Sequence, residues 1–340
     1  MSPFPQTPIT TLTGHTGIVH SVTYSSGNST YILTGCSDRT IRLYNPQKAA
    51  PTSSSTSAAG LVTKYTAHGY EVLSLAINAT NDKFISTGGD KTVFLWDVSS
   101  AQTLRRFGGH AGRVNRGVWG GDGDSVIVSA SFDGTVKLWD AKSHANKPVM
   151  TLDDAKDSVT DVVVHDAEIV AASVDGRVRS YDIRMGSCVV DVVGPPVTSL
   201  AVSKKGTEVL VGSLDSKLRL MDRANGELLR AYTDQVFVNT ELRVRSTLGL
   251  NDSVVLSGSE HGMVFVWDVM GGECLYKLSH VDRKEVTTRG THPVAAASKP
   301  KQHVVSAVAF CQSRREWCSG GGDGNVVVWG MGAGGNGNDG

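Results

Sequence analysis

The feature of this sequence that most constrains its fold is a short motif that recurs seven times. In every copy a turn residue is followed six positions later by an aromatic residue or a methionine. Successive turn positions lie 52, 43, 42, 40, 46 and 62 residues apart. A repeat of this length along a whole chain indicates units that bury their apolar faces against one another. The turn residues are Asp38, Asp90, Asp133, Asp175, Asp215, His261 and Asp323, and the residues six positions on are Tyr44, Trp96, Trp139, Tyr181, Met221, Trp267 and Trp329.

Each copy of the motif predicts two β-strands joined by a tight turn. In TVFLWD (92–97), Val93 and Leu95 alternate with Phe94 and Trp96, which is the two-residue period of a strand. Apolar segments upstream of the turns add further strands to each unit. Four strands make one blade, and a ring of blades leaves only short, protected edges. The sequence therefore predicts an all-β protein, a seven-bladed β-propeller.

The two ends of the repeat predict how the ring closes. The seventh copy ends near residue 330 and lacks its last strand, which residues 9–12 can supply. Pairing these two segments removes an unpaired sheet edge. We therefore expect a propeller over 9–330 that is closed by the N-terminal strand, with disordered segments at 1–8 and 331–340. The two longest intervals predict loop insertions at 46–60 and 280–303.

Composition excludes several classes of protein. The 33 basic and 33 acidic residues balance, which argues against a globally basic nucleic-acid-binding protein. The five cysteines form no C-x-x-C pair, so we expect free thiols in a reducing compartment. No signal peptide and no apolar run long enough to span a membrane is present. Direct nucleic-acid contact is not expected, although the basic segment 281–301 leaves RNA contact open beside the alternative of a solvated loop.

Serine or threonine, histidine and aspartate recur together in the first three copies. The histidine precedes the turn aspartate by 22 or 23 residues, and the serine or threonine precedes it by four. These residue types can form a nucleophilic triad. Their repetition in three blades favours a structural role, because one chain has no use for three identical active sites. We predict no catalytic residue, no metal site and no cofactor.

The pattern of Gly-His, turn aspartate and Trp-Asp resembles the WD-repeat propeller family. In that family the four residue types form a buried, hydrogen-bonded tetrad. Later copies depart from the pattern, with Ala171, Val211, Met221 and His261 at tetrad positions, so we expect the first three blades to be stiffer. The tetrads that the resemblance implies are His15, Thr34, Asp38 and Tyr44; His68, Ser86, Asp90 and Trp96; and His110, Ser129, Asp133 and Trp139.

Four segments of the chain resemble one particular family of WD-repeat proteins. Residues 67–77, 88–98, 109–115 and 173–186 are similar to the mitogen-activated protein kinase organiser family, WD-repeat scaffolds that are also found among spliceosome-associated proteins. The resemblance implies a non-catalytic scaffold for kinase-cascade or splicing proteins, in the cytoplasm and the nucleus. It also implies a monomeric propeller inside larger complexes. The chain departs from the family at the two insertions and at His261.

Two other functions remain open. Residues 169–184 resemble a motif by which some propellers dock the adaptor of cullin-RING ubiquitin ligases, ending in Arg184, although Ser180 departs from it. The chain would then be a substrate receptor. A propeller hydrolase would need polar groups that converge in the central channel, and the sequence gives no sign of them.

Propellers usually bind partners on the face formed by the turns and the starts of the inner strands. Large side chains there make the best anchors, because aromatic residues and arginine dominate binding energy. The repeat frame places six candidate contact residues near this face: Tyr70, Glu71, Arg113, Asn115, Phe132 and Leu214.

Overall fold

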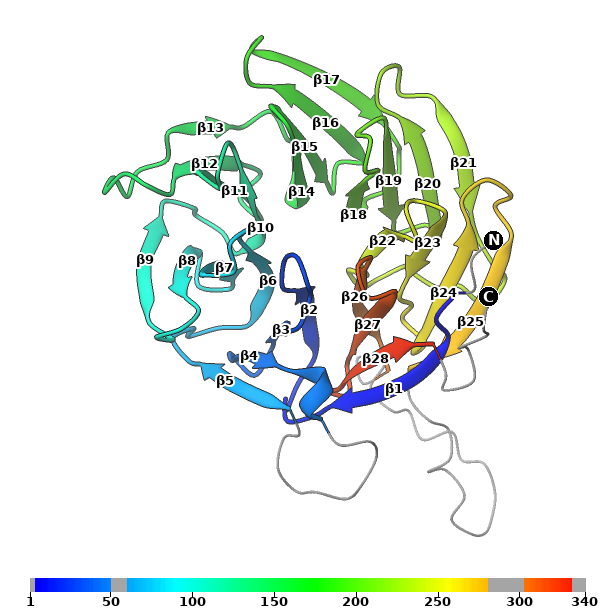
Figure 1. Ribbon diagram of the computed structural model, residues 1–340. Helices are drawn as coiled ribbons and strands as arrows, with labels where there is room; N and C mark the ends of the chain where they lie inside the picture. Colours follow the sequence, from blue (N-terminus) through cyan, green and yellow to red (C-terminus); the bar gives the residue numbers. More distant parts are fainter. Residues whose placement is uncertain (1–3, 50–59, 281–302, 332–340) are drawn as a thin grey trace, which may run out of the picture.

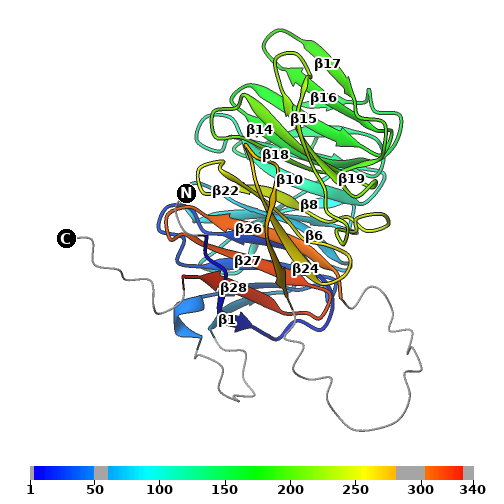
Figure 2. The same ribbon diagram turned by 90° about the vertical axis from the view of Figure 1, so that its right-hand side faces the viewer.

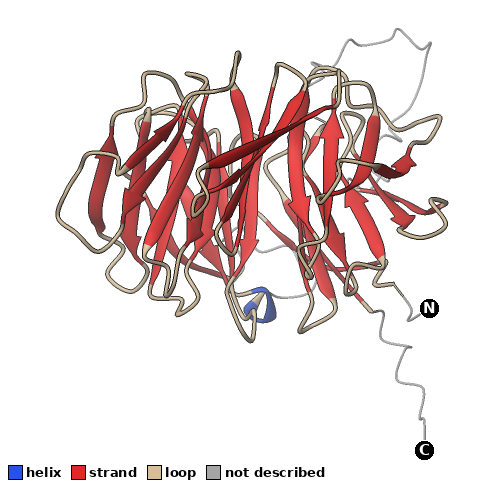
Figure 3. Cartoon of the chain, turned by 90° about the horizontal axis from the view of Figure 1, so that it is seen from above, coloured by secondary structure: helices blue, strands red, loops and turns tan. Residues whose placement is uncertain are grey.

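A computed structural model describes residues 4–49, 60–280 and 303–331 of the chain. Within these ranges the strands form seven four-stranded antiparallel sheets arranged in a ring (Figure 1). Seen from above, strands make up almost all of the regular structure, with one short 3-10 helix, η1 (Pro46–Lys48) (Figure 3). The prediction of a seven-bladed propeller is confirmed. The described residues include no helix long and apolar enough to cross a membrane.

In blades 1 to 6 the strand nearest the centre comes first along the chain. Blade 1 contains β2 (Val19–Tyr24), β3 (Ile32–Cys36), β4 (Ile41–Tyr44) and β5 (Leu61–Tyr65). Blade 2 contains β6 (Val72–Ile77), β7 (Lys83–Gly88), β8 (Thr92–Asp97) and β9 (Thr103–Gly108). Blade 3 contains β10 (Val114–Gly120), β11 (Val126–Ser131), β12 (Val136–Asp140) and β13 (Met150–Leu152).

The next three blades follow the same order. Blade 4 contains β14 (Val159–His165), β15 (Glu168–Ser173), β16 (Arg177–Asp182) and β17 (Ser187–Val192). Blade 5 contains β18 (Val197–Val202), β19 (Glu208–Ser213), β20 (Lys217–Asp222) and β21 (Leu228–Tyr232). Blade 6 contains β22 (Ser246–Gly249), β23 (Val254–Ser257), β24 (Met263–Asp268) and β25 (Cys274–Ser279).

Blade 7 is built from both ends of the chain. It contains β26 (Val305–Cys311), β27 (Glu316–Gly321), β28 (Val326–Gly330) and the N-terminal strand β1 (Thr7–Leu12). The blue β1 lies beside the red β28 in Figures 1 and 2, with Thr7 opposite Gly330 and Leu12 opposite Val326. The predicted closure of the ring by the N-terminal strand is confirmed.

The predicted boundary at the N-terminus is wrong, because ordered structure begins before residue 9. Phe4 is buried, and its ring lies 5.3 Å from that of Tyr276 and 5.9 Å from that of Trp317. The indole of Trp317 also donates a hydrogen bond to the carbonyl of Pro5 at 2.7 Å. Residues 4–8 therefore belong to the packed structure, since an apolar ring next to β1 fills space between blades 6 and 7.

The two predicted insertions are described only at their margins. Helix η1 occupies residues 46–48, while residues 50–59 and 281–302 lie outside the described residues. The basic segment 281–301 therefore also lies outside them. His280, which the prediction assigned to the second insertion, is buried in blade 7.

Neighbouring blades are joined by a hydrogen bond that recurs around the ring. In blades 1 and 5, the third residue counted from the start of the inner strand is a serine, and its hydroxyl accepts the backbone N–H of the next blade. The distances are 3.1 Å for Ser21 and 2.9 Å for Ser199. Blade 4 has Asp161 at this position, and its carboxylate accepts the N–H of Leu200 at 3.0 Å. Blade 3 has Arg116, which cannot accept, so this blade breaks the pattern.

A β-bulge recurs at the second residue of six inner strands. In β10, for example, the register shifts between Val114 and Arg116, which leaves Asn115 unpaired in the ladder. The others lie in β2, β6, β14, β18 and β26. A bulge redirects a side chain out of the regular alternation of a strand. Several of the residues at the bulges consequently line one pocket of the central channel, among them His20, Leu73, Asn115 and Ser306.

Candidate functional site

The hydrogen-bonded tetrad of blade 3 is complete. Trp139 donates its indole N–H to Ser129 Oγ at 2.8 Å. Ser129 Oγ lies 2.8 Å from His110 Nε2, and His110 Nδ1 lies 2.9 Å from Asp133 Oδ2. The four side chains thus connect β12, β11, the loop before β10 and the turn after β11. Blade 2 has the same arrangement, with Trp96 2.8 Å and His68 2.6 Å from Ser86 Oγ and with His68 bonded to Asp90.

Burial and hydrogen bonding determine the protonation states of the histidine and the aspartate in the tetrad of blade 3. Burial lowers the pKa of His110, so the imidazole is neutral at physiological pH. Burial alone would raise the pKa of Asp133, but hydrogen bonds from Thr135 and the adjacent His110 outweigh it and lower that pKa to about 2. Because an ionised carboxylate only accepts hydrogen bonds, His110 Nδ1 carries the proton and Nε2 accepts from Ser129.

The tetrad has the hydrogen-bond connectivity of a catalytic triad, but a substrate cannot reach its serine. Ser129 is fully buried and its oxygen already accepts the indole N–H of Trp139. A nucleophile must reach the substrate, and here no face of the serine is open to one. The arrangement instead satisfies four buried polar groups, which stiffens the blade.

Blade 1 departs from the tetrad at its aromatic residue. His15 bonds Thr34 Oγ1 at 2.8 Å and Asp38 Oδ2 at 2.9 Å, as the resemblance implies. Tyr44, however, donates its hydroxyl to the carbonyl of Thr13 at 2.9 Å rather than to Thr34. The phenol is longer than an indole N–H and projects past the threonine. Blade 1 therefore contains a triad and a separate tyrosine contact.

Blade 7 contains a tetrad that sequence reasoning missed. Trp329 donates to Ser319 Oγ at 2.9 Å, and His280 Nδ1 lies 2.8 Å from the same oxygen. His280 Nε2 lies 3.4 Å from Asp323 Oδ1. The available signal was Ser319 four residues before Asp323, but the histidine stands 43 residues before that aspartate, across the second insertion.

Blades 4 and 5 replace the histidine with an arginine from their own third strand. Arg179 Nη2 donates to Asp175 Oδ2 at 2.6 Å and its Nη1 donates to Ser173 Oγ at 2.8 Å. In blade 5, Arg219 makes the same two bonds to Asp215 and Ser213, both at 2.5 Å. The signal in the sequence was an arginine four residues after each turn aspartate. Blades 4 and 5 therefore have polar networks of their own, and the departures from the tetrad no longer support the expectation that the first three blades are stiffer.

Blade 6 replaces the tetrad with aromatic packing. Phe237 lies edge-on against both Phe265 and Trp267, with ring centroids 5.3 Å and 5.2 Å apart. His261, at the turn position, is exposed. The preceding residue, Glu260, accepts the backbone N–H groups of residues 240, 241 and 242 at 2.6, 2.7 and 2.8 Å. Glu260 therefore fixes the loop that leads into β22.

Three of the predicted contact residues are exposed on two neighbouring blades, near the turns. Tyr70 is 64% exposed, and Phe132 is 55% exposed. The guanidinium of Arg113 lies over the ring of Phe132 at 5.1 Å, a cation–π contact that holds both side chains in place. Tyr70 comes from blade 2, and the other two come from blade 3. We call these three residues the rim patch.

The other predicted contact residues lie differently. Leu214 and Glu71 are partly buried, and Glu71 lines the mouth of the central channel. Asn115 is only 2% exposed, and its amide donates to the carbonyl of Val159 at 2.7 Å. The structure therefore contradicts the choice of Asn115 as a contact residue. Its bulged backbone turns the side chain toward blade 4, where it joins two blades.

Arg184 lies in the turn between β16 and β17. Its side chain is 74% exposed and stands 3.5 Å from Asp182, so it is accessible to a partner. Ser180, where the ligase-docking motif has an aliphatic residue, lies in β16 and is partly buried.

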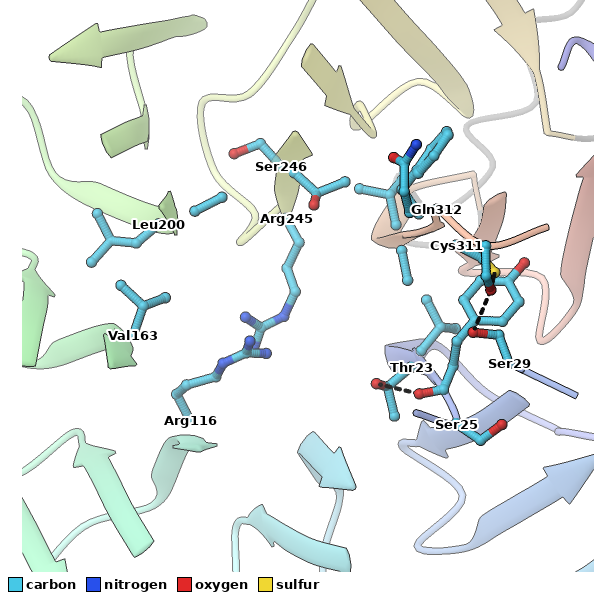
Figure 4. Close-up of a pocket in the computed structure, with 18 of the residues that line it drawn as sticks. Thr23, Ser25, Ser29, Arg116, Val163, Leu200, Arg245, Ser246, Cys311 and Gln312 are labelled. Carbon is cyan, nitrogen blue, oxygen red and sulfur yellow. Dashed lines mark hydrogen bonds between the residues drawn. The ribbon is translucent and has the colours of Figure 1, made fainter. Parts of the chain in front are cut away.

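Polar groups converge in the central channel, which the sequence had not indicated. Arg116 Nε lies 3.3 Å from Asp161 Oδ1, and Arg245 Nη1 lies 3.3 Å from Asp161 Oδ2. Figure 4 shows the side chains of Arg116 and Arg245 extending toward each other. Arg243 crosses toward blade 3 and donates to the carbonyl of Asn115 at 2.9 Å. Among the described residues this group supplies positive charge, not a nucleophile paired with a base.

The described residues contain one group with the geometry of metal ligands. His15, Cys36 and Asp38 offer three ligand atoms within 4.8 Å of one another. Both nitrogens of His15 are already engaged, by Thr34 and Asp38. Burial raises the pKa of the Cys36 thiol to about 11, so it is protonated at neutral pH and a poor ligand. These contacts favour a structural role.

Comparison with known proteins agrees with the geometry. The repeat family described as "WD domain, G-beta repeat" matches residues 6–45, 60–97, 101–140, 186–222 and 296–330. WD repeat domain-containing protein 83 of Rattus norvegicus is 42% identical over 290 residues, which cover 85% of this chain and 87% of the relative. The human protein of that name is 44% identical over 269 residues, 79% of this chain and 81% of the relative. A homolog from Dictyostelium discoideum is 28% identical over 296 residues, 79% and 87% of the two chains.

Seven blades, the buried His-Ser-Trp-Asp tetrads and these matches lead to one assignment. The chain belongs to the WD-repeat β-propeller family and, within it, to the family of WD repeat domain-containing protein 83.

Proposed function

We propose that the protein is a non-catalytic interaction scaffold that assembles mitogen-activated protein kinase cascade components, joins spliceosomal assemblies, or does both. The resemblance of four segments to the kinase organiser family supports the choice of partners. We further propose that the protein works in the cytoplasm and the nucleus, as one propeller within larger complexes.

The observation that carries this proposal is the rim patch. Tyr70, Arg113 and Phe132 are large side chains of the types that dominate binding energy, and they project from two neighbouring blades. The stacking of Arg113 on Phe132 reduces the conformational entropy lost when a partner binds. The serines that resemble nucleophiles are, by contrast, buried inside the blades.

A paired substitution tests the proposal. Replacing Arg113 and Phe132 together by alanine should leave the fold intact, because both side chains are exposed. Loss of a central pair of anchors should weaken partner binding at least about tenfold. The measurement is recovery of kinase-cascade and splicing proteins from cytosolic and nuclear fractions, quantified by mass spectrometry. Undiminished recovery of both groups by the variant would contradict the proposal.

Arg184 and Met185 provide a matched control, because they are also an exposed arginine and an exposed large apolar residue. Their replacement by alanine should leave kinase and splicing proteins bound. The exposure of Arg184 also keeps a second candidate, a cullin-RING substrate receptor. Under that alternative, replacing Arg184 and Met185 by alanine should abolish co-purification of the ligase adaptor, whereas replacing Arg113 and Phe132 should not.

A further inference from the structure

The arginines of the central channel are not part of the ring's repeated construction. Serine occupies the third residue of the inner strand in blades 1 and 5, where its hydroxyl joins adjacent blades. Arg116 and Asp161 replace it in blades 3 and 4. Asp161 keeps the joining hydrogen bond, so its carboxylate alone would meet the structural need. The surrounding arginines need another explanation.

These arginines come from opposite sides of the channel. Arg116 is in blade 3, whereas Arg243 and Arg245 lie in the connection that enters blade 6. We call the three residues the channel arginines. Figure 4 shows the side chains of Arg116 and Arg245 extending toward each other, and both lie 3.3 Å from the carboxylate of Asp161. Burial and the neighbouring Arg245 lower the pKa of both Arg116 and Arg243, as expected where positive charges crowd, yet a guanidinium remains protonated at neutral pH.

Positive charge exceeds negative charge within this group. Among the described residues the carboxylate of Asp161 contacts Arg116 and Arg245, and it also interacts electrostatically with Arg243. Its two oxygens also accept the backbone N–H groups of Val162 and Leu200, which leaves it less able to satisfy the arginines. Arg245 is only 8% exposed and its Nη2 is buried without a hydrogen-bond partner. A buried cationic donor without a partner destabilises the folded protein unless an anion accepts its hydrogen bond.

The cluster is held in place before any ligand arrives. Glu260 accepts three consecutive backbone N–H groups of residues 240–242 and thereby fixes the loop that carries Arg243 and Arg245. The bond from Arg243 to the carbonyl of Asn115 fastens the same loop to blade 3. Fixed donors bind an ion without first losing side-chain entropy.

Space is available on both sides of Arg245. A pocket of about 360 Å³ at the mouth of the channel is lined by Arg113, Arg243 and Arg245. A second pocket, of about 590 Å³, is lined by Arg245 and Arg116 from the other end. Both volumes suit a small molecule. Glu71 and Glu241 also line the first pocket, so an acidic peptide that covers the pocket would meet repulsion from both carboxylates.

We propose that the channel arginines bind a free, small phosphate-type oxyanion with at least two negative charges. Counting only the channel arginines and Asp161, three guanidinium groups against one carboxylate leave an excess of two positive charges, which a dianion balances. A phosphoryl group offers three acceptor oxygens, and the planar guanidinium is the side chain best shaped to bond them in pairs. This inference does not depend on the proposed scaffold function, because the three channel arginines that carry it are not members of the rim patch, although Arg113 of the rim patch also lines the first pocket.

The test is calorimetric titration of the full chain with inorganic pyrophosphate and with inorganic phosphate, with sodium chloride added to hold ionic strength constant. We expect saturable binding at one site and a rise in melting temperature that chloride alone does not produce. Replacing Arg245 by glutamine should weaken pyrophosphate binding at least tenfold. Arg184→Gln, which removes an exposed arginine, is the matched control and should bind as the wild type does. Absence of saturable binding to the wild type, or equal binding by the Arg245 variant, overturns the proposal.

Two further variants keep the test decisive. If Arg245→Gln does not fold, Arg243→Gln replaces it, since that change leaves the contacts of Asp161 with Arg116 and Arg245 in place. Glu260→Gln removes no arginine, yet it should weaken pyrophosphate binding severalfold by releasing the loop. A short peptide containing phosphoserine distinguishes the source of the phosphoryl group. Binding of pyrophosphate but not of the peptide supports a free ligand, and binding of the peptide alone contradicts it.

Discussion

Arg179 holds the carboxylate of Asp175 through both of its terminal nitrogens, with Nη2 at 2.6 Å and Nη1 at 3.3 Å. This pair occupies the place that histidine and aspartate occupy in the first three blades. Burial alone would raise the pKa of Asp175, but the bonds from Arg179 and Ser173 outweigh it and lower the pKa to about 2. The propeller thus stabilises its turns by two different networks, one based on a neutral imidazole and the other on an ion pair.

The ion-pair network predicts that blades 4 and 5 are as sensitive to loss of the turn aspartate as blade 3. Asp133→Ala should cost about 1–3 kcal/mol because buried donors lose their acceptor. Asp175→Ala should cost at least as much, about 3–5 kcal/mol, since it leaves the buried guanidinium of Arg179 uncompensated. Asp215→Ala should cost less than Asp175→Ala, because Arg219 is more exposed. Urea midpoints measure the three changes. A negligible effect of Asp175→Ala would show that the arginine network contributes nothing.

The neutral histidines predict that the protein loses stability in mild acid. Burial lowers the pKa of His15 and of His110 below the ordinary value of 6.5. Between the folded pKa and 6.5 the unfolded chain binds more protons, so the free energy of unfolding falls as the pH decreases. The contribution is fully present above pH 6.5. Urea midpoints from pH 8 to pH 5 should therefore decline, and His110→Gln should decline less steeply than the exposed control His144→Gln. Equal slopes for the two variants would refute this account.

Phe4 predicts that the segment before β1 contributes to stability. Phe4→Ala should destabilise the protein by about 3–5 kcal/mol, because a buried ring is removed from between Tyr276 and Trp317. Ile9, which is exposed on the neighbouring strand, is the control, and Ile9→Ala should change stability much less. Thermal melting followed by circular dichroism compares them. If the two variants melt alike, the packing of Phe4 is not a stabilising contact.

The burial of Asn115 predicts an effect on stability and not on partner recognition. Asn115→Ala removes hydrogen bonds to the carbonyl of Val159 and to Ser158, so it should cost about 1–3 kcal/mol. Recovery of partners per folded molecule should stay at the wild-type level, in contrast to the Arg113 and Phe132 pair. If the variant is as stable as the wild type but recovers fewer partners, Asn115 contacts a partner after all and this prediction is wrong.

Much of this protein is determined by local sequence. The six-residue spacing from turn aspartate to tryptophan, the alternation in the strands and the missing last strand together predict seven blades closed by the N-terminus. The spacing and the alternation can be read because each concerns residues within one hairpin or one strand, and the closure can be read because a ring of four-stranded blades leaves one strand position open for the N-terminal segment. The first three histidines are equally readable, since 22 or 23 residues separate them from their aspartates in an uninterrupted repeat.

Tertiary structure alone decided the remaining contacts. His280 reaches Ser319 across an insertion, so no fixed spacing marks the pair. Arg245 and Asp161 are 84 residues apart and meet only because the ring brings blade 6 and blade 4 to one channel. The repeat frame predicts a surface position for Asn115, because strand alternation cannot reveal a bulge that turns its side chain toward blade 4. Pairings of this kind depend on the curvature of the closed ring, which no local pattern of residues encodes.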